Sequence, residues 1–105
     1  MNRIQGKVAV ITGGTSGFGF AIAELFVREG AAVVMVGRKK EKGADAVKKI
    51  KKMAGIDARF IQCDVSKESD VKNLAETVIE SYKRIDILVN NAGMLVRKDF
   101  EKTTE

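Results

Sequence analysis

The chain contains four short runs that are apolar on most positions, at 7–12, 31–37, 58–64 and 86–90. β-Branched residues are frequent in them, and the polar residues gather mainly at their ends. Continuous apolar runs of this length are typical of strands that are buried on both faces, as in a parallel sheet. The pattern therefore predicts four buried strands.

Three longer segments lie between these runs, at 18–26, 40–53 and 67–82, and repeat apolar residues at helical spacing. Ser66 precedes the last of them and is predicted to be its N-cap. The order of strand and helix, repeated three times and closed by a strand, indicates an α/β fold with a parallel sheet and right-handed crossovers. We expect a single domain over residues 1–105, since no linker or repeat interrupts this order.

The composition and charge of the chain limit the partners, metal sites and cellular location that we expect. The net charge is +5, but the lysines concentrate at 39–52 and interleave with apolar residues, as on the solvated face of an amphipathic helix, so we expect no nucleic-acid partner. No apolar run approaches a membrane span, and no membrane is expected. The chain has no histidine, and no metal site is predicted. Cys63 is the only cysteine, which favours a cytoplasmic location.

Four glycines fall within residues 13–19, between the first strand and the first helix. A sharp strand-to-helix turn brings backbone N–H groups and the positive end of a helix to one point, where phosphate binds, and glycine lets the phosphates approach. Gly13, Gly17 and Gly19 follow a G-x-x-x-G-x-G spacing, and the Gly-Lys-Ser/Thr ending of a nucleoside-triphosphatase loop is absent. The alternative is a tight turn that only packs helix against strand.

Three motifs resemble the short-chain dehydrogenase/reductase family. "TGGTSGFG" at 12–19 is similar to its N-terminal signature, "NNAG" at 90–93 to its second signature, and "CDV" at 63–65 to the segment that receives adenine. The resemblance implies a three-layer Rossmann-like sandwich with strand order 3-2-1-4, in which nucleotide binds at the point where the strand order reverses. It also implies that the glycine turn binds a nicotinamide dinucleotide.

The resemblance also assigns roles along the cofactor. Gly13, Gly17 and Gly19 would shape the pyrophosphate turn, where Thr15, Ser16 and the backbone of Phe18 would lie along the phosphates and ribose. The family often has isoleucine or leucine at the position of Phe18, so the pocket is expected to differ slightly there. Asp64 and Val65 would contact adenine, while Asn91, Ala92 and Gly93 would line the ribose and the floor of the cleft. Asn90 and Asn91 can also be explained as a polar strand end.

The residues after the second strand favour NADP over NAD. Relatives that prefer NAD usually carry an aspartate where Gly37 stands, to bind the ribose diol. Arg38 and Lys39 follow instead, and a guanidinium can pair with a 2′-phosphate. The alternative is that these cations only begin a solvated helix.

The family's catalytic serine and Tyr-x-x-x-Lys pair are not found in this chain. Its only tyrosine is Tyr82, and the residue four positions later is Asp86. We therefore name no catalytic residue and expect Tyr82 to anchor the core. The chain is expected to be the N-terminal, cofactor-binding part of a longer NADP-dependent oxidoreductase, inactive by itself. The alternative is a non-catalytic nucleotide-binding or interaction module.

The predicted topology leaves the fourth strand, with its apolar Ile87–Val89 segment, at an edge of the sheet. An unpaired apolar edge is a template for pairing with another chain. The helix at 67–82 is expected alone on its face of the sheet, which leaves apolar surface uncovered. We therefore expect a homo-oligomer, with a twofold dimer as the simplest form.

Overall fold

The computed structural model describes residues 4–15 and 17–91. Its elements alternate as the sequence predicts, with bounds within one or two residues of the expected ones. The strands are β1 (Val8–Thr12), β2 (Ala32–Gly37), β3 (Arg59–Gln62) and β4 (Ile87–Asn90), and the helices are α1 (Gly17–Arg28), α2 (Lys40–Ala54) and α3 (Glu68–Tyr82).

The four strands form one parallel sheet in the order β3-β2-β1-β4, which confirms the predicted topology. β1 is buried along its whole length because it lies between β2 and β4 and both faces of the sheet are covered. The strands end in register, with Thr12 beside Val36 on one side and beside Asn90 on the other. The carboxyl ends of the strands, and the loops that follow them, therefore meet along one edge of the sheet.

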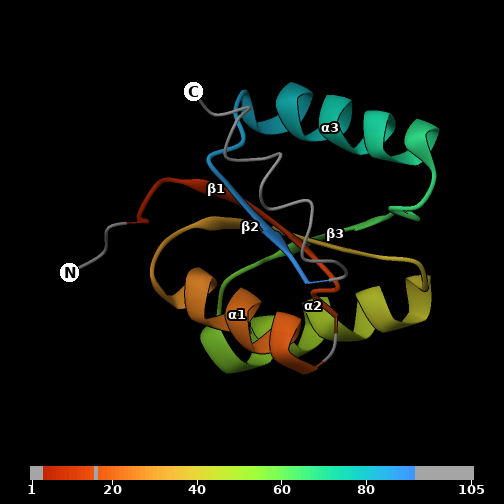
Figure 1. Cartoon of the computed structure of the whole chain (residues 1–105). Helices are drawn as coiled ribbons and strands as arrows, with labels where there is room; N and C mark the ends of the chain where they lie inside the picture. Colours follow the sequence, from red (N-terminus) through yellow and green to blue (C-terminus); the bar gives the residue numbers. More distant parts are fainter. Residues whose placement is uncertain (1–3, 16, 92–105) are drawn as a thin grey trace.

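The helices lie in two layers, with α1 and α2 on one face of the sheet and α3 on the other (Figure 1). Each face has its own core. Ile11, Met35 and Ile50 belong to the core under α1 and α2, whereas Val10 and Val78 belong to the core under α3. The expected three-layer arrangement is confirmed. The switch point, at which the strand order reverses, lies between β1 and β4.

Helices α1 and α2 bury mainly small residues rather than their largest apolar ones. Helix α1 buries Gly19, Ala23 and Val27, whereas Phe18 is 73% exposed. Helix α2 buries Gly43, Ala46 and Ile50, and Met53 is 47% exposed. Small residues spaced one turn apart let each helix axis approach the sheet closely, and larger apolar side chains then pack at the flanks of the contact.

The predicted N-cap of α3 is wrong. The cap position is Lys67, which makes no side-chain capping hydrogen bond. The Ser66 hydroxyl instead donates a hydrogen bond to Oδ1 of Asp64, so it is not the cap of the helix.

Candidate functional site

The turn from β1 into α1 holds the start of the helix directly against the end of the strand. The N–H of Gly13 donates to the carbonyl of Val36, 2.9 Å away, which ties the turn to β2. A Cβ on Gly19 would collide with the carbonyl oxygen of Gly13 and lie 2.8 Å from its carbonyl carbon, so only glycine fits this approach. Gly17 has a φ of 58°, and a Cβ there would meet nothing within 4 Å. This glycine is needed for its left-handed backbone, not for space.

A cavity of about 500 Å³ opens beside this turn, at the carboxyl edge of the sheet. Its wall combines the end of β1, the connection from β2 to α2 and the connection from β3 to α3. The lining residues are Thr12, Gly13, Thr15, Val36, Gly37, Arg38, Lys39, Lys42, Cys63, Asp64, Val65 and Ser66. Open α/β sheets bind ligands at this edge, where the strand order reverses.

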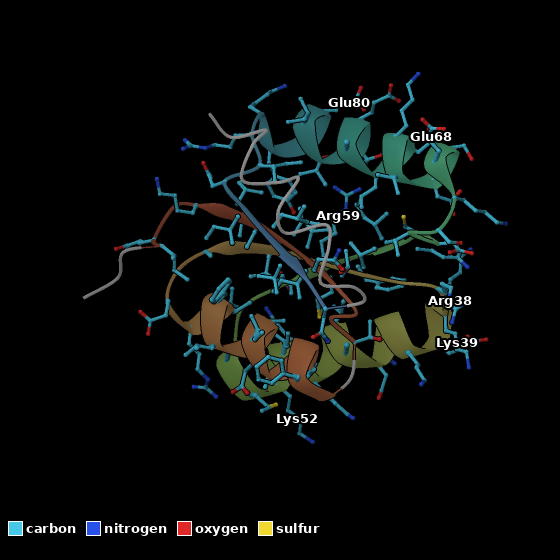
Figure 2. All side chains as sticks on the ribbon, viewed as in Figure 1. Arg38, Lys39, Lys52, Arg59, Glu68 and Glu80 are labelled. Carbon is cyan, nitrogen blue, oxygen red and sulfur yellow. The ribbon has the colours of Figure 1, made fainter. Side chains whose placement is uncertain are left out.

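Three cationic side chains stand along one part of this cavity. Arg38 and Lys39 form the connection from β2 to α2, and Figure 2 shows them together at the start of α2, away from Lys52 near the other end of the helix. Lys42 joins them from the first turn of α2. A cationic rim of this kind attracts a phosphate group.

Asp64 lies at the other part of the cavity, just after β3. Its Oδ1 accepts hydrogen bonds from the Ser66 side chain at 2.7 Å and from the Ser66 backbone N–H at 3.0 Å. These two bonds are the main reason why the pKa of Asp64 is lowered, and the positive charge of Arg38 acts in the same direction. Asp70, in the first turn of α3, accepts the backbone N–H of Asp64 at 2.9 Å. The carboxylate is therefore ionised near neutral pH and held in a fixed loop.

The end of β4 is tied to the glycine turn. The hydroxyl of Thr12 lies 2.9 Å from Oδ1 of Asn90, and it accepts the backbone N–H of Asn91 at 3.0 Å. The side-chain Nδ2 of Asn91 lies 3.5 Å from the carbonyl oxygen of Gly13. Asn91 therefore adjoins the turn, as its predicted place in a nucleotide site requires.

The structure brings six of the predicted site residues together in the cavity wall: Gly13, Thr15, Arg38, Lys39, Asp64 and Val65. Gly17, Phe18, Gly19 and Asn91 are not in that wall but lie at or beside the turn next to it. The predictions for Ser16, Ala92 and Gly93 fall outside the described residues.

Sequence reasoning gave no individual role in the site to Thr12, Val36, Lys42, Cys63 or Ser66, although all five line the cavity and Thr12 and Cys63 belong to the matched motifs. Lys42 gave no signal of its own, because it is one of several lysines in α2, and only the position of the first turn of that helix brings it to the cavity. Cys63 is buried, and burial, followed by the charges of Asp70 and Asp64, raises the pKa of its thiol. It is therefore a neutral wall residue and not a thiolate nucleophile.

Tyr82 lies far from this cavity in the fold. It ends α3, and its half-buried side chain packs on the core with Val8 and Ile85, at the edge of the sheet where the strands begin. The expected core anchor is confirmed. No group of three or more potential metal-ligating side chains occurs in residues 4–15 and 17–91, and no helix in this part of the chain is long and apolar enough to cross a membrane.

Comparison with known sequences places the chain among dehydrogenases. The sequence model described as short chain dehydrogenase matches residues 7–105. The chain is 46% identical over 104 residues to the NADP-dependent (R)-specific alcohol dehydrogenase of Lentilactobacillus kefiri, a match that covers 98% of this chain and 40% of that protein. It is 47% identical over 93 residues to tropinone reductase-like 1 of Erythroxylum coca, with 89% of this chain and 33% of that protein covered.

Solved structures agree with the sequence matches. L-Sorbose reductase from Gluconobacter frateurii, complexed with NADPH and L-sorbose, superposes with a TM-score of 0.81 at 43% identity over 90% of this chain and 36% of that chain. NAD⁺-bound xylitol dehydrogenase superposes with a TM-score of 0.80 at 32% identity, over 88% of this chain and 35% of that chain. The chain thus spans 40% or less of the length of these four proteins. Because the family model matches residues 7–105 and the fold superposes on L-sorbose reductase with a TM-score of 0.81, the chain belongs to the short-chain dehydrogenase family.

Proposed function

We propose that the cavity binds NADP(H), and that the chain is the dinucleotide-binding part of an oxidoreductase that transfers hydride between nicotinamide and an alcohol or carbonyl group. The observation that carries the choice of NADP is the cationic rim of Arg38, Lys39 and Lys42. Gly37, at the end of β2, offers no carboxylate to a ribose diol. The relatives include an NADP-dependent alcohol dehydrogenase and a reductase complexed with NADPH, beside an NAD⁺-bound xylitol dehydrogenase.

The donors and acceptors of the cavity fit the adenosine half and the pyrophosphate of such a ligand. The glycine turn offers backbone N–H groups to the pyrophosphate, and the cationic rim offers charge-assisted hydrogen bonds to the 2′-phosphate. Next to the ribose that bears this phosphate, the ionised carboxylate of Asp64 can accept a hydrogen bond from the amino group of adenine. The nicotinamide ring supplies the hydride chemistry when the cofactor is bound.

We propose further that the 105 residues bind cofactor without turning over substrate. Reduction of a carbonyl needs an acid that protonates the developing alkoxide. Tyr82, the only tyrosine, packs at the opposite edge of the sheet from the cavity. The alternative function, a nucleotide-binding or interaction module unrelated to redox chemistry, predicts no preference between the phosphorylated and unphosphorylated cofactors.

Calorimetric titration tests the proposal. NADPH and NADH are compared, together with 2′,5′-ADP and AMP, which carry the adenosine end alone. Arg38→Ala should reduce the preference for the 2′-phosphorylated ligands by roughly ten- to a hundredfold, since a charge-assisted hydrogen bond is worth about 1.5–3 kcal/mol. Lys52→Ala is the matched control, because it removes one positive charge from the last turn of α2, the helix that follows Arg38, away from the cavity. Equal preference in Arg38→Ala and the original chain would refute the assignment.

We also propose that copies of the chain associate through β4 or the adjoining face of α3. In the described part of the chain β4 pairs with β1 on one side only, and Val71 and Ile79 of α3 are 40% and 46% exposed. Light scattering across a concentration series tests this. A twofold dimer is expected, and a monomer that persists at high concentration would contradict it.

For the location of the protein we propose the cytoplasm, supported by the buried free thiol of Cys63 and testable by cell fractionation.

A further inference from the structure

The connection from β2 to α2 is a two-residue link, and it carries two of the three cations of the rim. Arg38 and Lys39 are both exposed, and Lys39 is the N-cap of α2 with an extended backbone and no side-chain capping bond. Long exposed side chains lose rotamer freedom when they bind a ligand. How well they bind therefore depends on how firmly the backbone beneath them is held.

That backbone is held from β3, the neighbouring strand. The N–H of Cys63 donates to the carbonyl of Gly37 at 2.8 Å, as a continuation of the ladder between β2 and β3. Next to it, the side-chain Nε2 of Gln62 donates to the carbonyl oxygen of Arg38 at 3.0 Å. Gln62 thus supplies a side-chain hydrogen bond to the backbone of the connection between β2 and α2.

Gln62 does this from outside the cavity. It lies in the wall of a separate groove of about 600 Å³ between α2 and β3, together with Val47 and Phe60, and it is absent from the wall of the cofactor cavity. A trans peptide is planar, so the carbonyl of Arg38 and the N–H of Lys39 point in opposite directions. With the carbonyl turned toward Gln62, the N–H of Lys39 is turned away from that groove.

We propose that Gln62 is a positioning residue for cofactor selectivity. Its amide fixes the peptide between Arg38 and Lys39, so that the Arg38 guanidinium and the Lys39 N–H are aimed at the 2′-phosphate of the dinucleotide. This inference rests on the proposed binding of NADP(H). Gln62 does not touch the ligand in this account. It acts on the 2′ end alone, because the glycine turn and Asp64 are held by other bonds.

The test is the ratio of the dissociation constants of AMP and 2′,5′-ADP, measured by calorimetry on the whole chain. Gln62→Leu and Gln62→Met both remove the donor and keep a side chain of similar size. Each should lower the ratio by about fivefold, the worth of one ordinary hydrogen bond, through weaker binding of 2′,5′-ADP with unchanged binding of AMP. A purely structural role would weaken both ligands alike.

Ser81→Ala is the matched control. It removes the bond that Arg59, on the same strand, donates to the Ser81 hydroxyl at 2.9 Å, and it changes no charge. The ratio should stay at its original value. An unchanged ratio in both Gln62 variants, or an equal loss of affinity for both ligands, overturns the inference. The proposed function still stands in that case if Arg38→Ala reduces the preference for 2′,5′-ADP. If the original chain does not prefer 2′,5′-ADP, the proposed NADP(H) function and this inference both fail.

Discussion

Replacing Gly19 by alanine tests whether the close approach of α1 to β1 builds the phosphate turn. The added Cβ would collide with the carbonyl oxygen of Gly13 and lie 2.9 Å from Nδ2 of Asn91. The colliding oxygen belongs to the backbone, so no rotamer change can remove the overlap. The helix must move away from the strand, or the turn must deform.

The expected size follows from two opposing effects. Overpacking by one methyl group costs about 1–3 kcal/mol, and a rigid backbone partner places this site at the upper end. Alanine is favoured over glycine in a helix by about 1 kcal/mol, which offsets part of that cost. We expect a net loss of about 2 kcal/mol, or a melting temperature lower by roughly 10 °C in a chain of this size. Affinity for 2′,5′-ADP should fall by at least about tenfold, as for one lost charge-assisted bond.

Scanning calorimetry and titration of the same samples separate the two effects. Gly55→Ala is the control, because Gly55 caps α2 with a φ of 73° in open space, far from the turn. Alanine in a left-handed conformation costs about 1–2 kcal/mol, so the control loses similar stability but should keep its affinity. The reasoning is refuted if Gly19→Ala melts no lower than the original chain, or if its affinity falls no further than that of Gly55→Ala.

Two further predictions concern stability. The pKa of Asp86 is lowered mainly by the hydrogen bond from Arg84 and next by the hydrogen bond from the Val8 N–H. The ionised carboxylate therefore stabilises the fold above its unfolded pKa of about 4. This stabilisation is lost as the pH falls through the lower pKa of the folded state. Asp86→Asn should therefore melt lower than the original chain at neutral pH and converge with it in acid, and a constant difference across a pH series of melting curves would contradict this. Ile50→Ala should lose about 2–5 kcal/mol in urea unfolding, since Ile50 is fully buried. Met53→Ala, at a half-exposed position of the same helix, should change stability by about 0.5 kcal/mol or less, and equal losses in the two variants would show that the core lies elsewhere.

The sequence predicts the elements well because their signals are local. The run before Thr12 is apolar without alternation, and in the structure β1 is buried on both faces. The glycine turn fixes where the strand order reverses, and the observed order β3-β2-β1-β4 follows. Arg38 and the glycines could be named in advance for the same reason, since they follow recognisable strands, whereas the role of Asp64 was predicted from the resemblance to the family.

Helix faces were harder to predict, because large apolar side chains dominate a periodic pattern. The pattern of α1 draws attention to Phe18 and Leu25, yet both are more than half exposed. Gly19, Ala23 and Val27 are buried instead. Small residues contribute little to a hydrophobic pattern, and their role is visible only when the distance between helix and sheet is known.

The sequence by itself determined the fold class, the strand order and the position of the candidate nucleotide site at the carboxyl edge of the sheet. The tertiary structure alone decided which side chains meet there. Lys42 is one of many lysines in α2 until the helix start is placed against the cavity. In the sequence, Gln62 is one polar residue of β3 with no distinguishing pattern. In the structure its amide lies 3.0 Å from the carbonyl oxygen of Arg38, 24 positions earlier. Contacts between distant residues depend on the register of neighbouring strands, and a one-residue shift in register would send the Gln62 side chain to the other face of the sheet.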